Sequence, residues 1–534
     1  MGIPSYFSYI VRNHRNIIKP LSVSADSPKI NNLYLDCNSF IYDAHHHLSK
    51  TGGSNKTKNT AVHEDNIIKH VCESLIKMMK QLKPNKRILI AFDGVAPMAK
   101  LNQQRNRRYM TAFQNSIADN KESIWNTASI TPGTAFMQKL GQNITNRFQR
   151  PCEFGLEQII VSSSDEPGEG EHKIYEYIRN NTNYHQNTQT IIYGLDADLI
   201  MLTLNHLHIS ENMFLYRETP EFIKHIDKTL NPNENYLLDI PLFAKTLINE
   251  LSHEQKPIET ISLNNNKLFD YILLCFFLGN DFLPHFPALN IRTTGIHNLI
   301  NAYKFVFTEG ETLTHEREII WKNMRKFIAH LAANELDYIK EEYVQRDKHS
   351  KRLMHAQSRP GEDENLLLPL KERAHELYIN PQDAGWETRY YKILFKTTID
   401  DDRRKEICTN YLAGLEWTMK YYSTGCADWR WLYHYHYPPL LVDLIKYVPY
   451  FDHTFVPLQP KQPVSPLVQL CYVLPPSSMA LIPYALHKKL LAEQPDWYVV
   501  NYVFLWAFCK FFWEAHVELP HIDMDVLERL VKGF

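Results

Sequence analysis

Seven carboxylates stand at positions that suggest metal chemistry. They occur at five separate places along the chain: Asp36, Asp93, Glu169 with Glu171, Asp196 with Asp198, and Asp281. A single acidic residue at the start of a helix is usually a cap or a partner of the helix dipole. Here, acidic residues repeatedly follow short apolar runs or a helix-like segment, which indicates that the seven act together.

Clustered carboxylates repel one another and lose solvation, so a protein tolerates such a cluster when cations neutralise it. Hard oxygen ligands favour Mg²⁺, with Mn²⁺ as a substitute. Seven carboxylates suit two ions. Two metal ions about 4 Å apart activate a water and stabilise the leaving oxygen in the hydrolysis of a phosphodiester. We therefore predict phosphodiester hydrolysis.

A basic helix face follows the second of these places. Lys100, Gln104, Arg107 and Arg108 are spaced i, i+4, i+7 and i+8, which lines one face of a helix. The alternative is a solvated basic stripe on the protein surface. Because Lys100 comes seven residues after Asp93, we expect this face to lie near the metals. Arginine forks match the free oxygens of a terminal phosphate, so the face predicts recognition of a 5′ end.

The elements that must position these residues follow an α/β rhythm. Four apolar runs, each followed by an acidic loop and a helix-like segment, are predicted strands: Leu33–Leu35, Arg87–Phe92, Gln158–Val161 and Thr190–Tyr193. In sheets built this way, ligands bind at the carboxyl ends of the strands. The rhythm therefore predicts a mostly parallel sheet on which distant carboxylates converge.

From about Leu237 the pattern becomes helical. Three long stretches are predicted helices: Leu268–Leu278, Glu316–Tyr343 and Arg403–Tyr422. The polar segment 345–365 reads as a linker or mobile loop. We therefore expect a nuclease core over 1–344 and a helical second region over 366–534.

Composition limits the class of protein. The 534 residues are 44% hydrophobic and 22% charged, which favours a soluble, folded chain over a disordered one. A net charge of −2 does not itself indicate a nucleic-acid partner, but it averages over local patches. The eight cysteines include no C-x-x-C pair, so neither a zinc ribbon nor a disulfide framework is expected, and the chain resembles a reduced intracellular protein.

Two weaker signals have structural interpretations. The aromatic-rich stretch Trp497–Trp513 is interrupted by Asn501 and Lys510, which favours a buried helix over a membrane span. The run 45–47 consists of three histidines, but neighbours on a helix point in different directions. We expect that run to form a polar helix surface and not a metal site.

The motifs, taken together, resemble those of the Xrn-type 5′→3′ exoribonucleases, relatives of the flap-endonuclease (FEN-like) and PIN-like nucleases. The matching segments include Met1-Gly-Ile-Pro-Ser-Tyr-Phe, Leu35-Asp-Cys-Asn38, Phe92-Asp-Gly-Val-Ala-Pro97, Asn102-Gln-Gln-Arg105, Thr131-Pro-Gly-Thr134, Ser164-Asp-Glu-Pro-Gly-Glu-Gly-Glu-His-Lys173, Gly194-Leu-Asp-Ala-Asp198 and Gly279-Asn-Asp-Phe-Leu-Pro284. They run in family order over about the first 300 residues. The segment from Trp429 to Pro438 resembles a Trp- and Tyr-rich segment that completes the family's active site.

The resemblance implies a PIN-like/FEN-like α/β core with a largely helical C-terminal extension. It implies that all seven carboxylates are metal ligands or close supporters, and that the four residues of the basic face bind a 5′ phosphate. It further implies substrate contacts by Asn38, Tyr42, Trp429 and Trp431. Tyr42 stands where the family usually has a base-stacking histidine, and aromatic stacking tolerates any base. Which tryptophan stacks stays open.

The expected function is processive, Mg²⁺-dependent degradation of single-stranded RNA with a 5′ monophosphate to nucleoside 5′-monophosphates, in RNA decay including mRNA degradation. We expect a cytoplasmic monomer without a membrane partner. Met98 replaces a basic residue common in the family, which removes a charge near the pocket. The chain stops at Phe534, so a short form without the family's long extension is expected. The alternatives are a flap-type DNA nuclease and a non-catalytic RNA-binding scaffold.

Overall fold

The computed structural model describes residues 2–21, 29–50, 60–117, 125–218, 225–231, 234–355 and 366–534. Two compact units are present, each assembled from segments that are distant in the sequence. The sheet unit comprises 10–244, 461–500 and 520–534, and the helical unit comprises 1–9, 245–460 and 501–519. The expected division on either side of 345–365 therefore does not coincide with the boundary between the two units.

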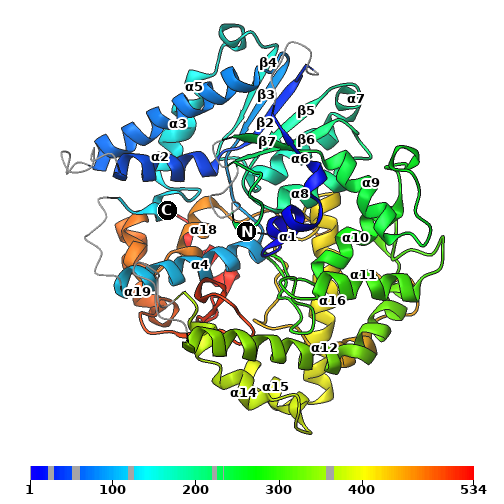
Figure 1. Cartoon of the computed structure of the whole chain (residues 1–534). Helices are drawn as coiled ribbons and strands as arrows, with labels where there is room; N and C mark the ends of the chain where they lie inside the picture. Colours follow the sequence, from blue (N-terminus) through cyan, green and yellow to red (C-terminus); the bar gives the residue numbers. More distant parts are fainter. Residues whose placement is uncertain are drawn as a thin grey trace. The chain divides into compact units, whose positions relative to one another are not determined.

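The sheet unit is built on seven strands (Figure 1), in the order β1-β7-β6-β5-β2-β3-β4. Their bounds are β1 (Ile18–Pro20), β2 (Asn32–Asp36), β3 (Arg87–Ala91), β4 (Gln158–Ser162), β5 (Thr190–Tyr193), β6 (Met213–Glu218) and β7 (Asn235–Leu238). The five strands from β6 to β4 are parallel, and β7 and β1 are antiparallel additions at one edge. The α/β class and the four expected strands are confirmed.

Helices cover both faces of this sheet, because side chains of a strand alternate in direction. Leu33 and Leu35 of β2 are buried in one core with α2 (Asn38–Lys50), α3 (Thr60–Leu82) and α5 (Ala135–Arg147). Tyr34 points the other way, where its ring meets those of Tyr177 and His185. That face carries α6 (Gly170–Asn180), α7 (Thr182–His185) and α8 (Asp198–His206).

A second core of the sheet unit joins α4 (Met98–Ile117) to segments from the end of the chain. These are α18 (Pro466–Val473), α19 (Tyr484–Glu493) and α20 (Met524–Val531). Met98 and Leu101 are buried in this core with Val468 and Leu470. An apolar side chain at position 98 therefore serves packing.

The helical unit contains most of the remaining helices. They are α10 (Asn266–Phe276), α11 (Gly295–Val306), α12 (Trp321–His355), α13 (Leu368–Lys371), α14 (Ala374–Ile379), α15 (Trp386–Leu394), α16 (Asp401–Ser423) and α17 (Leu441–Tyr447). Two short strand pairs accompany them: β8 (Thr314–His315) with β9 (Glu318–Ile319), and β10 (Val503–Leu505) with β11 (His516–Glu518). The unit boundary cuts α1 (Tyr6–Asn13) and α9 (Ile240–Leu251). The three expected helices correspond to α10, α12 and α16.

The expectations for two segments and for the histidine run need correction. Residues 345–355 are the end of α12 and not a linker, while 356–365 lie outside the described residues. The stretch Trp497–Trp513 contains strand β10 and no α-helix, because its aromatic and β-branched residues also suit a strand paired with β11. Across the described ranges, no helix is long and apolar enough to cross a membrane.

The histidine run is only partly a polar surface. His46 and His47 are exposed, but His45 is buried, and its Nδ1 lies 3.1 Å from Nε2 of His63 on α3. Alternate directions on one helix explain the difference, since α2 packs its inner face against α3.

Candidate active site

The first part of the site lies where β2 and β3 end. Asp36 is the last residue of β2, and Asp93 follows β3 by two residues. Asn38, the first residue of α2, donates from Nδ2 to Oδ2 of Asp93 over 2.5 Å and accepts at Oδ1 from the Asp93 backbone N–H over 3.1 Å. The backbone N–H of Gly170 donates to Asp93 Oδ1 over 2.7 Å. Both oxygens of Asp93 are therefore oriented.

The start of α6 approaches these carboxylates closely. A Cβ on Gly170 would lie 2.7 Å from Asp36 Oδ1 and 3.2 Å from the Ala91 carbonyl oxygen, so a larger residue there would force its neighbours to shift. Glu169 is the N-cap of α6, and Glu171 lies in its first turn. The helix dipole at this end favours negative charge. The β4–α6 loop thus brings two further carboxylates to Asp36 and Asp93.

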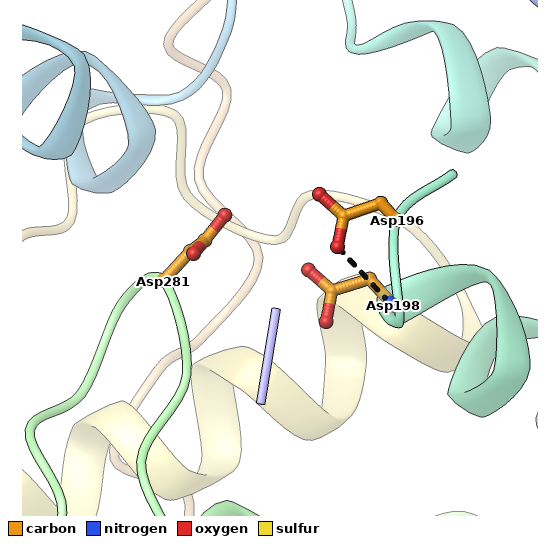
Figure 2. Close-up of side chains that lie close together, drawn as sticks. All are labelled: Asp196, Asp198 and Asp281. Atoms are coloured by element: carbon orange, nitrogen blue, oxygen red, sulfur yellow. Dashed lines mark hydrogen bonds between the residues drawn. The ribbon is translucent and has the colours of Figure 1, made fainter. Parts of the chain in front are cut away.

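The third part comes from the β5–α8 segment (Figure 2). Asp196 lies in the loop, and Asp198 begins α8, with its backbone N–H donating to Asp196 Oδ1 over 3.4 Å. The pair offers carboxylate oxygens within 4.8 Å of one another. The turn is tight, because a Cβ on Gly194 would lie 2.2 Å from a methyl carbon of Leu199. Six of the seven predicted carboxylates thus come from neighbouring strand ends of the sheet unit.

Electrostatic effects show that these six act on one another. Burial raises the pKa of Asp36 well above its usual value, and the charges of Asp93, Asp196 and Glu169 raise it further. Burial likewise raises the pKa of Glu171, with added repulsion from Asp196, Asp198 and Glu169. Such a cluster is unfavourable unless cations compensate it.

The donor set fits hard divalent cations. Within the described part of the chain, Oδ1 of Asp36 and Oε2 of Glu171 are buried and accept no hydrogen bond. Buried carboxylate oxygens are normally satisfied, so these two are suited to a metal ion. Oxygen-only donors favour Mg²⁺ or Mn²⁺ over softer metals. The acidic cluster is therefore able to hold a metal.

Asp281, also drawn in Figure 2, belongs to the helical unit. It is half-buried in the turn after α10, where Asn280 Oδ1 accepts from the backbone N–H groups of Phe282 and Leu283, each over 2.9 Å. This side-chain hydrogen bonding fixes the turn that presents Asp281. Its place in a metal site with the other six stays a prediction.

The basic helix face lies on α4, but its four members differ. Lys100 is buried, and its Nζ lies 2.5 Å from Glu169 Oε2. Gln104 has a buried Oε1 without a hydrogen-bond partner among the described residues. Burial lowers the pKa of Arg108 to about 10, and its Nη2 donates to the Ile130 carbonyl oxygen over 3.5 Å. Arg107 is exposed. The face therefore begins at the acidic cluster and ends in solvent.

Tyr42 lies on α2, two helical turns before the end of that helix, and is 40% exposed. It is close enough to Arg108 for its charge to affect the pKa of the guanidinium. The accessible ring thus stands beside the basic face, where a base-stacking role stays a prediction. Asn38, the other predicted substrate contact on α2, mainly orients Asp93. The structure therefore favours an indirect contribution of Asn38 to substrate binding.

The two predicted stacking residues of the helical unit, Trp429 and Trp431, have different surroundings. The ring of Trp431 stacks on Trp417 with centroids 5.0 Å apart and an interplanar angle of 23°. A Cβ on Gly414 would lie 3.0 Å from Trp431, which shows how closely α16 approaches that ring. Trp429 is half-buried, and no ring of the described residues packs on it. Trp429 therefore has the more available ring.

Two basic residues beside the carboxylates escaped prediction. Lys173 is buried on α6, and its Nζ donates to the carbonyl oxygens of Phe92 and Ser163 over 2.8 and 2.7 Å. It thus joins the ends of β3 and β4, and burial lowers its pKa to about 8. Burial lowers the pKa of Arg217 on β6 to about 10, opposed by the charge of Asp196. Lys173 could have been found from the sequence, because it is the basic residue within the acidic motif. Arg217 was missed because strand β6, which carries it, was not predicted.

Comparisons with known proteins agree with the motif pattern. The model of the XRN 5'-3' exonuclease N-terminus matches residues 1–219, and that of the Xrn1 helical domain matches 263–376 and 371–533. The 5'-3' exoribonuclease 2 homolog of Drosophila melanogaster is 27% identical, with 98% of this chain and 70% of that protein covered. The 5'-3' exoribonuclease 1 of Saccharomyces cerevisiae is 28% identical, with 92% and 40% covered.

A human relative and one solved structure also match the chain. The human 5'-3' exoribonuclease 1 is 26% identical, and the alignment covers 98% of this chain but 33% of the human protein. Among solved structures, the T5 D15 protein co-crystallized with metal ions matches at a TM-score of 0.22 and 11% identity, covering 61% of this chain and 98% of that one.

Proposed function

The chain belongs to the XRN 5'-3' exonuclease family, and from this we propose that it is a Mg²⁺-dependent 5′→3′ exoribonuclease. Its proposed substrate is single-stranded RNA with a 5′ monophosphate, and its products are nucleoside 5′-monophosphates. The chain spans 70% of the fly relative and 40% of the yeast relative. The activity proposed here therefore concerns the catalytic portion that they share.

The observation that carries the proposal is the convergence of Asp36, Asp93, Glu171 and their neighbours at one edge of the sheet. Two Mg²⁺ ions, or Mn²⁺ in their place, would supply an activated water and charge stabilisation at the leaving oxygen. The carboxylates would hold these ions. The Asn38 side chain and the Gly170 N–H keep Asp93 in a fixed orientation.

Direction of cleavage follows from the basic face of α4. Lys100 reaches the acidic cluster, and Arg108 and Gln104 lie farther along the same helix. A terminal phosphate carries more charge and more free oxygens than an internal phosphodiester, and guanidinium forks match it. Binding at this face places the first phosphodiester bond beside the carboxylates. Hydrolysis of that bond removes one nucleotide at a time.

Aromatic stacking supports processive movement along the strand. Tyr42 has an accessible ring near Arg108, and Trp429 has an available ring in the helical unit. Stacking is independent of base identity, so it suits a nuclease that degrades any sequence. The corresponding biological role is RNA decay, including mRNA degradation, by a cytoplasmic monomer.

The metal site is tested by replacing Asp196 and Asp198 together with alanine. We expect Mg²⁺-dependent cleavage of 5′-phosphorylated RNA to be lost while RNA binding persists. Glu176→Gln, on the exposed side of α6, is the matched control and should cleave normally. Unchanged cleavage by the double variant would refute the metal model and leave a different hydrolytic centre.

The choice of substrate is tested by comparing phosphorylated single-stranded RNA with a bifurcated DNA flap. We expect the RNA to be degraded and the flap to be a poor substrate. Preferential cleavage of the flap would identify a structure-specific DNA nuclease. Binding of RNA without any cleavage in Mg²⁺ or Mn²⁺ would identify a non-catalytic scaffold.

A further inference from the structure

One ion pair connects the basic face of α4 with the acidic cluster. Lys100 stands in the first turn of α4 and Glu169 at the N-cap of α6, and the 2.5 Å between Nζ and Oε2 makes a direct contact. Both residues are buried, with 7% and 4% of their surface exposed. A buried pair of this kind is weakly screened by solvent, so a change of charge at one partner acts strongly on the other.

The charge of Lys100 also reaches beyond Glu169. Its ammonium group also interacts electrostatically with the carboxylates of Asp36 and Glu171 in the same cluster. Lys100 is therefore part of the electrostatic balance of the proposed metal site. By its position on α4 it is also part of the proposed phosphate-binding face.

A lysine ammonium carries a single charge on a flexible stem, so it can be shared between anions or move from one to another. A divalent cation bound by Glu169 neutralises that carboxylate and repels the ammonium. Both effects favour contact between Lys100 and a phosphate. Conversely, a phosphate that draws Lys100 away leaves Glu169 a better ligand for a cation.

We propose that Lys100 couples the two binding events, so that divalent cations and the 5′ phosphate of RNA each increase the affinity of the site for the other. This inference rests on the proposed function, because it assumes that both ligands bind at this site. Linkage requires the coupling to be reciprocal. The enzyme thereby recognises a 5′ phosphate fully only when its metal site is filled.

The proposal gives Lys100→Met an effect of opposite sign on the two ligands. Loss of the ammonium removes one phosphate contact and so weakens discrimination for a 5′ phosphate. The same loss removes a positive charge that competes with cations for Glu169, so Mn²⁺ binds more tightly. A purely structural role for Lys100 would weaken both. Arg107→Met is the matched control, because Arg107 is exposed farther along the same helix.

The experiment measures dissociation constants for a short RNA with phosphorothioate linkages, carrying either a 5′ phosphate or a 5′ hydroxyl. Titrations are run with the full chain in EDTA and in Ca²⁺ at constant ionic strength, using fluorescence anisotropy. Ca²⁺ serves as the probe because it also binds through oxygen ligands. Mn²⁺ binding without RNA is followed by calorimetry, and thermal unfolding verifies that each variant is folded.

For the wild-type chain, we expect the preference for the 5′ phosphate to be about fivefold or more greater in Ca²⁺ than in EDTA, the usual lower range of coupling between sites. Lys100→Met should remove this cation dependence and raise Mn²⁺ affinity. Arg107→Met should lower the preference for phosphate in both conditions and keep the dependence on Ca²⁺.

Two results would overturn the proposal in distinguishable ways. If the wild-type chain prefers the 5′ phosphate equally in EDTA and Ca²⁺, the coupling is wrong and the proposed function stands. If it binds phosphate and hydroxyl ends equally in both conditions, 5′-phosphate recognition is wrong and the coupling falls with it. The wild-type comparison alone decides between these results, whatever the stability of the Lys100 variant.

Discussion

Asn38 and Asp93 are joined by two reciprocal hydrogen bonds, one from the Asn38 amide to Asp93 Oδ2 and one from the Asp93 backbone N–H to Asn38 Oδ1. The amide can donate and accept at once, which neither aspartate nor alanine at position 38 would do. Asn38 thus links the start of α2 to the loop after β3. Its contact is with a proposed metal ligand, so it acts through Asp93.

Replacing Asn38 with alanine should raise the Mg²⁺ concentration needed for half-maximal activity. Loss of a residue that orients a metal ligand typically costs about 10–100-fold in metal affinity or activity. Steady-state rates measured over a Mg²⁺ titration test this, with Ser49→Ala near the other end of α2 as the control. A drop in activity that excess Mg²⁺ does not alter, with an unchanged activation constant, would contradict a positioning role.

Gly170→Ala should inactivate the enzyme with little loss of secondary structure. The added Cβ would lie 2.7 Å from Asp36 Oδ1, so either the carboxylate or the start of α6 must shift. Misplacement of reacting groups by about 1 Å can cost roughly 10²-fold in rate. Cleavage assays and circular dichroism are the measurements. Full activity in this variant would show that the close approach of α6 is unimportant.

Trp429→Ala and Trp431→Ala should separate substrate binding from stability. Loss of a base-stacking ring costs about 1–3 kcal/mol of binding, so Trp429→Ala should weaken RNA affinity by about tenfold. Trp431 packs on Trp417, and its removal should instead lower the unfolding temperature. Anisotropy and thermal unfolding distinguish the two. The assignment fails if Trp431→Ala keeps its stability and loses RNA affinity.

Glu335 gives the helical unit a dependence on pH. It accepts from the backbone N–H groups of Leu441 and Val442 at the start of α17, and burial raises its pKa to about 8 from the usual 4.5. The folded state therefore holds this proton more tightly than the unfolded state. Its contribution to stability is complete below about pH 4.5 and is lost as pH rises toward 8.

Glu335→Gln removes that titration and keeps an oxygen acceptor. We expect the unfolding temperature of the wild-type chain, relative to the variant, to fall by a few degrees between pH 5 and pH 8. Differential scanning calorimetry at both pH values gives the comparison. Parallel unfolding temperatures for the two proteins would mean that Glu335 keeps an ordinary pKa.

Much of the fold could be predicted from the sequence, because short apolar runs mark buried strands. The strands before Asp36, Asp93 and Asp196 were predicted, and strand ends of a parallel sheet converge, so the acidic cluster followed. Helical spacing likewise placed Lys100 and Arg108 on one helix. Spacing along the sequence does not show which of these side chains already form ion pairs within the protein. The contact of Lys100 with Glu169, 69 positions away, depends on how α4 and α6 pack.

Other features depended on tertiary context. The stretch Trp497–Trp513 is apolar enough for a helix or a strand, and pairing of β10 with β11 decided the outcome. His45 looked like part of a polar run, yet packing of α2 on α3 buried it beside His63. The joining of α18 and α20 to α4 brings together segments over 350 residues apart, which local patterns do not reveal.

The central claim is that this enzyme hydrolyses RNA from a 5′ monophosphate. The most direct test compares degradation by the purified chain, in Mg²⁺, of one single-stranded RNA carrying a 5′ monophosphate, a 5′ hydroxyl or a cap, with the products identified by chromatography. We expect the monophosphate form to be degraded at least about tenfold faster, a difference of ~1.4 kcal/mol, and to yield nucleoside 5′-monophosphates. Equal rates for the hydroxyl and monophosphate forms would contradict the claim.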